Sequence, residues 1–178
     1  AALADDPRRK ILVTLHRREN LGEPMRHVCQ AIQILLHRFP DVLVIFPWHL
    51  NPEVRKVVSA ELGEHPRALL VEPLEYAPLV HLMKLSTLVL TDSGGIQEEA
   101  PSLGKPVLVA RETTERPEGI EAGSARLVGT TTSVIVDNVT ELLTQPDVYD
   151  AMSHTQNPYG DGQAAGRICD HVLHFLNL

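Results

Sequence analysis

The sequence predicts an α/β fold in which helices cover both faces of a parallel sheet. Short, continuously apolar runs alternate with helix-forming segments along most of the 178 residues. Strands that are buried on both faces of a parallel sheet have this composition. Polar clusters follow four of the apolar runs, and ligands of such sheets bind beyond the carboxyl ends of the strands. A length of 178 residues fits one domain, or the greater part of one.

Six apolar segments are predicted to form the strands of this sheet. They span residues 10–15, 42–46, 69–71, 87–90, 106–109 and 127–128. Pro106 is compatible with this prediction, because proline is allowed at the first position of a strand.

The segments between and after the strands are predicted to be helices. The first begins at Pro24, because proline is tolerated in the first turn, and its apolar residues repeat at helical spacing through Phe39. The others span residues 53–62, 76–85, the segment opened by Gly94 and Gly95, 134–143, 148–153 and 162–176.

Composition and charge exclude several classes of protein. A net charge of −7 argues against a nucleic-acid surface, and no apolar run approaches the roughly 20 residues that a membrane-spanning helix needs. None of the nine histidines has a metal-ligand spacing beside a carboxylate or thiol, so no metal site is expected. Cys29 and Cys169 lie in apolar helical patterns, which predicts buried free thiols in a reducing compartment and a cytoplasmic protein.

Residues 1–9 are predicted to be a linker, or the end of a preceding domain. They are acidic and then basic, which does not match a signal peptide. The sequence has no initial Met, and we expect that an upstream portion is missing. The domain itself is predicted to span residues 10–178.

The segment 91–100, with the sequence TDSGGIQEEA, is typical of a phosphate-binding turn. It joins an apolar strand to a helix, and Gly94 and Gly95 let a ligand approach bare backbone. The first N–H groups of a helix have no internal partner, and the dipole favours negative charge there. Ser93 suits both a helix cap and a phosphate ligand, and Glu99 lies in reach of a sugar diol. The alternative is a Gly-Gly turn that only caps a helix.

Further polar side chains follow other strands. His16 is interpreted as a proton shuttle or phosphate donor, or else as a loop histidine that caps backbone groups. Arg17 supplies fixed positive charge, or belongs to a solvated basic loop. His49 is either a ligand or a structural residue. The segment 113–118, which contains Arg116, is interpreted as a clasp for phosphate or sugar, or as a surface loop with local ion pairs.

Five sequence blocks, in this order, resemble the non-hydrolysing UDP-N-acetylglucosamine 2-epimerases. The blocks are TLHRRENLGEP (14–24), PWHLNP (47–52), TDSGGIQEEAPSLGKPVLV (91–109), TTERPE (113–118) and NPYGDGQA (157–164). The third and fourth blocks are highly specific, and together the blocks cover the chain from near residue 10 to its end.

The resemblance implies a fold like that of GT-B glycosyltransferases, in which two Rossmann-like domains face each other across a cleft. This chain resembles the C-terminal domain, which is one half of that fold. The family's catalytic acid/base carboxylates lie mainly on the N-terminal domain, which implies that they are outside this sequence. The chain by itself is therefore expected to be inactive, and the longer protein is expected to be a homodimer.

The implied reaction is the reversible inversion of UDP-GlcNAc at C2, which gives UDP-ManNAc. UDP is eliminated to leave a 2-acetamidoglucal and is then added again to the opposite face; no cofactor is implied. The resemblance makes His16 catalytic and assigns the ribose hydroxyls to Glu99. By the same resemblance, the diphosphate is bound by His16, Ser93, Gly94, Gly95 and Arg116.

The resemblance also concerns the base and a second ligand. The family commonly has an aromatic residue near the uracil where this chain has Leu79, which leaves backbone groups near Leu74 and Leu79 to read the base. Arg17 and His49 match positions that contact a second, activating UDP-GlcNAc in some bacterial members.

Two other functions fit the same nucleotide cradle: a GT-B glycosyltransferase domain and a non-catalytic nucleotide-sugar sensor. The first and fourth sequence blocks favour the epimerase. The final helix has an apolar stripe, and GT-B relatives send their last helix across the cleft to the N-terminal domain. Without that domain, we expect the stripe to be uncovered and then hidden by self-association or by folding onto the core.

Overall fold

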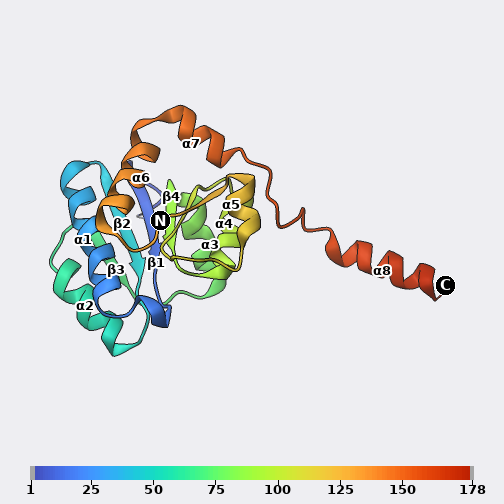
Figure 1. Cartoon of the computed structure of the whole chain (residues 1–178), viewed down its shortest axis with the longest axis horizontal. Coiled ribbons are helices and arrows are strands. Elements are labelled where there is room, and N and C mark those ends of the chain that lie inside the picture. Colours follow the sequence, from blue (N-terminus) through green and yellow to red (C-terminus); the bar gives the residue numbers. More distant parts are fainter. Residues whose placement is uncertain (1–2, 177–178) are drawn as a thin grey trace.

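A six-stranded parallel sheet forms the centre of the fold (Figure 1). The computed structural model describes residues 3–176, so the first two residues of the predicted linker and the last two of the predicted domain lie outside the description. The strand order is β3-β2-β1-β4-β5-β6, and each neighbouring pair is parallel. The strands are β1 (Arg9–Thr14), β2 (Val42–Pro47), β3 (Ala68–Val71), β4 (Leu88–Thr91), β5 (Val107–Val109) and β6 (Ala125–Leu127). The predicted fold class is confirmed.

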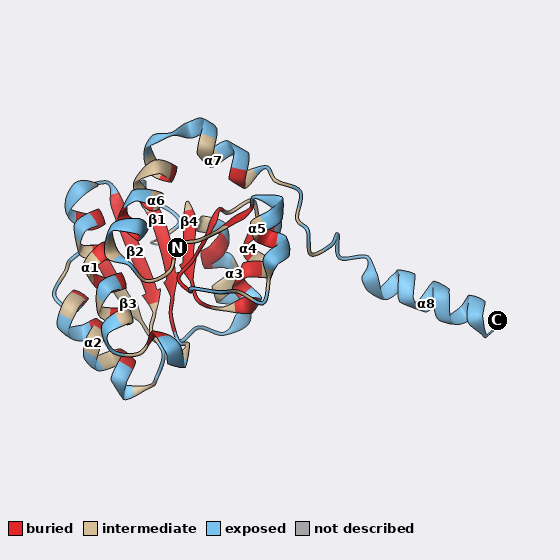
Figure 2. Ribbon diagram, viewed as in Figure 1, coloured by how far each residue is buried: buried red, intermediate tan, exposed pale blue. Residues whose placement is uncertain are grey.

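Helices cover both faces of this sheet, and the strands lie between them as buried elements (Figure 2). One face packs against α1 (Glu23–Arg38), α2 (Pro52–Leu62), α6 (Thr132–Thr144) and α7 (Pro146–Ser153). The other packs against α3 (Tyr76–Leu85), α4 (Gly94–Ser102) and α5 (Pro117–Ala122). Successive residues of β1 point to opposite faces, so that Ile11 and Val13 lie in the first core and Leu12 in the second. Because both faces of the sheet are covered, residues 11–13 of β1 are apolar in succession.

The ends of several elements differ from the prediction. β1 begins at Arg9, and the last strand spans Ala125–Leu127 in place of residues 127–128. A short 3-10 helix, η1 (Arg18–Asn20), replaces part of the expected loop after β1. The helix α5 replaces part of the expected loop 113–118. Local residues mark the start and the end of this helix, since it begins with Pro117 and ends before Gly123, whose φ is 87°.

The last helix, α8 (Ala164–Phe175), projects away from the rest of the domain (Figure 1). The expected start at residue 162 is wrong, because Gly162 has a φ of 79°, a left-handed conformation that lies outside a helix. No residue of α8 is buried, and the exposed apolar side chains include Ile168, Val172 and Phe175 (Figure 2). The uncovered stripe is therefore present, and the expected alternative that α8 folds onto the core is wrong, while self-association through α8 stays a prediction.

The two cysteines lie in different environments. Cys29 is buried in α1, as predicted, and burial raises the pKa of its thiol to about 12. Cys169 is exposed, so the prediction of a second buried thiol is wrong. The reason is that Cys169 lies on α8, a helix that no other described segment covers. Within residues 3–176, no helix combines the length and apolar composition needed to cross a membrane.

Candidate functional site

The carboxyl ends of β1 and β4 lie side by side at the point where the strand order reverses. Thr14 pairs with Thr91 in the sheet, and their Oγ1 atoms are 2.6 Å apart. The connections that follow two such strands leave in opposite directions and open a crevice, where open α/β sheets bind nucleotides. The loops that begin at this crevice carry His16 and Ser93.

A pocket of about 350 Å³ opens at this crevice and brings together five predicted site residues. These are His16, His49, Leu74, Leu79 and Ser93, and the remaining lining residues are Thr14, Leu15, Pro47, Pro73 and Ile96. The ring centroids of the two histidines are 6.1 Å apart. The lining therefore combines apolar side chains with imidazole and hydroxyl groups, a combination that suits a flat base joined to a polar group.

The N-terminus of α4 lies beside the pocket. Ser93 occupies the predicted N-cap position of the helix, but its hydroxyl makes no capping hydrogen bond. The Ser93 backbone N–H donates to Oγ1 of Thr91 at 2.9 Å, which holds the turn without using the serine hydroxyl. Gly94 and Gly95 are the first helical residues, where backbone N–H groups have no carbonyl partner within the helix. This terminus can therefore bind an anion.

Two guanidinium groups cover the start of α4. A Cβ atom placed on Gly94 would lie 3.7 Å from Nη2 of Arg17 and 3.9 Å from Nη2 of Arg116. Arg116 forms an ion pair with Glu98, and the buried Nε of Arg17 has no hydrogen-bond partner among the described residues. The predicted second-site candidate Arg17 thus lies at the same helix terminus as Arg116. Two fixed positive charges at the positive end of a helix dipole favour an anion with more than one charge.

His16 is held by a buried carboxylate, Asp92. Its Nδ1 is 2.9 Å from Oδ1 of Asp92, and its backbone N–H points at the same carboxylate. Asp92 also accepts hydrogen bonds from the backbone N–H of Arg17 and from Nδ2 of Asn20, both at 2.9 Å. Burial opposes the charged form, but the hydrogen bond from His16 and those from Arg17 and Asn20 outweigh it and lower the pKa of Asp92.

Arg111 joins the loop after β1 to the loop after β5. Its guanidinium donates to Oε1 of Glu19 at 2.8 Å and to both carboxylate oxygens of Glu115, at 2.6 and 3.0 Å. The hydrogen bonds from Arg111 lower the pKa of Glu115 to about 2. Thr114 adds a link to α4, because its hydroxyl donates to Oε1 of Gln97 at 2.6 Å. These contacts fix the loop that carries Arg116 over the start of α4.

Glu99 lies one turn into α4. A Cβ atom placed on Gly95 would be 3.8 Å from Oε1 of Glu99, so the carboxylate lies beside the exposed Gly95 in the first turn of the helix. Its charge raises the pKa of Tyr76, which begins α3. Glu99 is thus placed between the N-terminus of α4 and the segment that carries Leu74 and Leu79.

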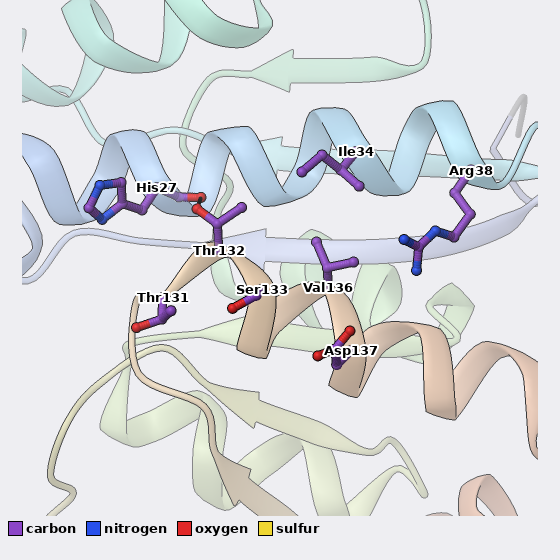
Figure 3. Close-up of a pocket in the computed structure, with 8 residues that line it drawn as sticks. All are labelled: His27, Ile34, Arg38, Thr131, Thr132, Ser133, Val136 and Asp137. Atoms are coloured by element: carbon purple, nitrogen blue, oxygen red, sulfur yellow. Dashed lines mark hydrogen bonds between the residues drawn. The ribbon is translucent and has the colours of Figure 1, made fainter.

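A second groove, of about 550 Å³, runs between α1 and α6 (Figure 3). It contains no predicted site residue, and its lining includes Ile34, Val136 and Asp137. Thr132 closes one end, where its hydroxyl donates to the backbone oxygen of His27 at 2.9 Å. Among residues 3–176, no group of three His, Cys, Asp or Glu side chains could hold a metal ion in this groove or elsewhere.

Sequence reasoning missed the residues that position the site: Asn20, Asp92, Gln97 and Arg111. Their roles come from contacts between distant segments; His16 and Asp92, for example, are 76 residues apart. Asp92 does carry a sequence signal, because a charged residue placed directly after a buried strand needs partners. That signal indicates an interaction but does not identify its partner.

The chain is similar to known proteins along nearly its whole length. The family profile described as UDP-N-acetylglucosamine 2-epimerase matches residues 2–173. The UDP-N-acetylglucosamine 2-epimerase of Bacillus subtilis is 53% identical over 163 residues, which are 92% of this chain and 43% of that protein. The S. aureus MnaA–UDP co-structure aligns with a TM-score of 0.95 and 44% identity, and covers 100% of this chain and 49% of that chain.

One structural match concerns the fold alone. The C-terminal domain of a glycosyl transferase group 1 family protein (LpcC) from Francisella tularensis aligns with a TM-score of 0.64 and 15% identity, over 85% of this chain and 82% of that chain. The fold of this chain is thus one half of a GT-B-like epimerase, and the chain spans less than half the length of the B. subtilis and S. aureus relatives. Because the profile matches nearly the whole chain, and because identity to a B. subtilis member is 53%, the chain belongs to the UDP-N-acetylglucosamine 2-epimerase family.

Proposed function

We propose that this chain is the UDP-binding half of an enzyme that interconverts UDP-GlcNAc and UDP-ManNAc. The observation that carries the proposal is the convergence of Arg17 and Arg116 on the open N-terminus of α4, next to a partly apolar pocket. A nucleoside diphosphate needs both features, because its phosphates require positive charge and its base requires a flat apolar surface. The S. aureus relative, whose structure is described as a complex with UDP, supports the choice of nucleotide.

In the proposed reaction, the C2 proton of the sugar is removed and the bond between C1 and the diphosphate oxygen breaks. A 2-acetamidoglucal and UDP result, and UDP then adds again with protonation of C2 on the opposite face. Negative charge on the diphosphate grows as the bond breaks. The α4 N–H groups, the Ser93 hydroxyl, His16 and Arg116 stabilise this charge, and so favour the transition state over the bound substrate.

The remaining predicted residues bind parts of UDP-GlcNAc that do not react. Glu99 accepts hydrogen bonds from the ribose hydroxyls, and backbone groups near Leu74 and Leu79 hold the uracil. The arginine and histidine matched to a second ligand, Arg17 and His49, lie at or beside the same pocket. A second nucleotide sugar at these residues would therefore touch the first.

The proton transfer at C2 requires acid and base groups that we place on a second domain. The chain has 43% of the length of the B. subtilis relative, which leaves room for such a domain in the longer protein. We therefore expect the chain by itself to bind UDP without converting UDP-GlcNAc, and the longer protein to convert UDP-GlcNAc without an acceptor. A glycosyltransferase would need an acceptor, and a sensor would bind without turnover.

Calorimetric titration of UDP into the chain tests the binding site, with Arg116→Leu as the test variant and Arg126→Leu as its control. The two arginines match well, because each pairs with a helix glutamate and their side chains are 37% and 34% exposed. Loss of a hydrogen bond to a charged group costs about 1.5–3 kcal/mol, so Arg116→Leu should weaken UDP binding about 10- to 100-fold. Arg126→Leu should leave it unchanged. Equal effects of the two substitutions would contradict the proposed diphosphate site.

A further inference from the structure

Asp92 is surrounded by hydrogen-bond donors from the loop after β1. Its side chain is fully buried, and its two oxygens receive the backbone N–H groups of His16 and Arg17, Nδ2 of Asn20 and Nδ1 of His16. Asn20 is fixed in turn, because its Nδ2 also donates to the backbone oxygen of Ala110 at 2.9 Å. A carboxylate in this position organises the whole loop that carries His16.

The donors around Asp92 also determine which nitrogen of His16 carries a proton. An ionised carboxylate only accepts hydrogen bonds, so the contact at 2.9 Å requires a proton on Nδ1 of His16. In the neutral ring, Nε2 is then the unprotonated nitrogen. Nδ1 is directed toward buried Asp92, while 42% of the His16 side chain remains exposed at the pocket. Nε2, on the other side of the ring, is thus left for a ligand.

We propose that Asp92 is a positioning residue for the epimerisation. Asp92 fixes His16 with its proton on Nδ1 and so directs Nε2 of the ring at the diphosphate of the nucleotide sugar. The inference rests on the proposed function of the pocket. In the protonated ring, Nε2 donates a hydrogen bond to the departing diphosphate, while Asp92 balances the positive charge of the ring at Nδ1. A carboxylate that orients an imidazole in this way acts through the imidazole and does not touch the substrate.

Two other histidines provide references of the opposite tautomer in the same protein. Nδ1 of His49 accepts a hydrogen bond from the backbone N–H of Asn51 at 3.1 Å, and Nδ1 of His65 accepts one from the backbone N–H of Arg67 at 3.2 Å. In their neutral forms these rings carry the proton on Nε2. The neutral forms of His16 and His65 should therefore give distinguishable ring nitrogen signals.

The direct test is nitrogen NMR of the histidine rings in the uniformly labelled chain, at a pH where the rings are neutral. We expect His16 to be protonated on Nδ1 and His65 on Nε2. In Asp92→Asn, we expect the amide oxygen to keep accepting hydrogen bonds from the backbone N–H of Arg17 and from Nδ2 of Asn20. The NH₂ group of the amide then faces His16. The His16 proton should then move to Nε2, while His65 stays unchanged and serves as the control for folding.

Either of two results would overturn the inference: a proton on Nε2 of His16 in the unsubstituted chain, or an unchanged His16 tautomer in folded Asp92→Asn. The first result needs no variant, so the test holds even if Asp92→Asn fails to fold.

Kinetics of the longer protein separate this inference from the proposed function. Asp92→Asn should lower kcat for UDP-GlcNAc by about 10²-fold, the lower range for general acid–base groups, with a much smaller change in KM. An unchanged kcat would overturn the positioning role. Absence of turnover in the unsubstituted protein refutes the proposed function, and the NMR result then decides by itself whether Asp92 sets the tautomer of His16.

Discussion

The substitution Gly94→Ala tests whether a phosphate lies against the first turn of α4. Gly94 begins the helix, and it is not among the glycines with positive φ, so its backbone conformation suits alanine. The added methyl group would lie 3.7 and 3.9 Å from the nearest guanidinium nitrogens of Arg17 and Arg116, which are ordinary van der Waals distances. The unliganded chain therefore has room for alanine. A Gly→Ala change at such a site stabilises a protein by about 0.4–1 kcal/mol.

The same methyl group would crowd a phosphate bound between the two guanidinium groups. A phosphate oxygen that accepts from both guanidinium groups would lie about 2.7–2.9 Å from each donor nitrogen. The methyl carbon, 3.7 and 3.9 Å from the same two nitrogens, would crowd an oxygen held between them, so we expect the phosphate to give up at least one charge-assisted hydrogen bond, worth about 1.5–3 kcal/mol. UDP binding should weaken by about 10- to 100-fold, while stability stays equal or rises. Opposite effects on binding and stability distinguish a ligand site from a structural turn.

Calorimetry with UDP and thermal unfolding of the chain measure both effects. Gly166→Ala is the matched control, because Gly166 is also a helical glycine and its added Cβ would meet nothing within 4 Å. It should raise stability in the same way and leave UDP binding unchanged. If Gly94→Ala binds UDP as tightly as the unsubstituted chain, the diphosphate does not lie at this helix terminus, and the glycines serve only the turn.

Two further predictions concern the ribose and the last helix. Glu99→Ala should weaken binding of UDP by about 1–3 kcal/mol but leave binding of the 2′,3′-dideoxy analogue unchanged, because the analogue lacks the hydroxyls that Glu99 would hold; equal losses for both nucleotides would show that the carboxylate does not hold the diol. The chain should self-associate through α8 at high concentration in sedimentation experiments, and Phe175→Ser should weaken this association, because Phe175 is 83% exposed. A monomer at all concentrations, with α8 solvated, would contradict the second prediction.

The sheet could be predicted because a run of apolar residues indicates directly that the strand is buried. Residues 11–13 of β1 are buried on both faces of the sheet and are apolar in succession, and this property is visible without knowledge of the neighbouring strands. The ends of elements depend on single residues and were predicted less well. The segment 113–118 was expected to be a loop because of its charges, although Pro117 and Gly123 mark the limits of a short helix. The charged residues correctly indicated an exposed segment, but they did not indicate that a helix begins at Pro117.

The last helix shows a different limit. Its apolar side chains recur at helical spacing, which predicts a helix with one face in need of a partner. That pattern does not specify the partner, since any apolar surface satisfies it. The exposure of Cys169 follows from the same fact: a position in the apolar pattern is buried only where something packs against the helix.

The candidate site depends on strand order, which local patterns do not contain. Sequence places His16 after one strand and Asp92 after another, and each position predicts only that a polar group lies at the carboxyl edge. The contact between them exists because β1 and β4 are neighbours in the order β3-β2-β1-β4-β5-β6, although two strands separate them along the chain. The same adjacency brings Arg17 to Gly94. The reversal of strand order between β1 and β4 therefore opens the crevice and brings these charged groups together at it, which is the position where open α/β sheets bind nucleotides.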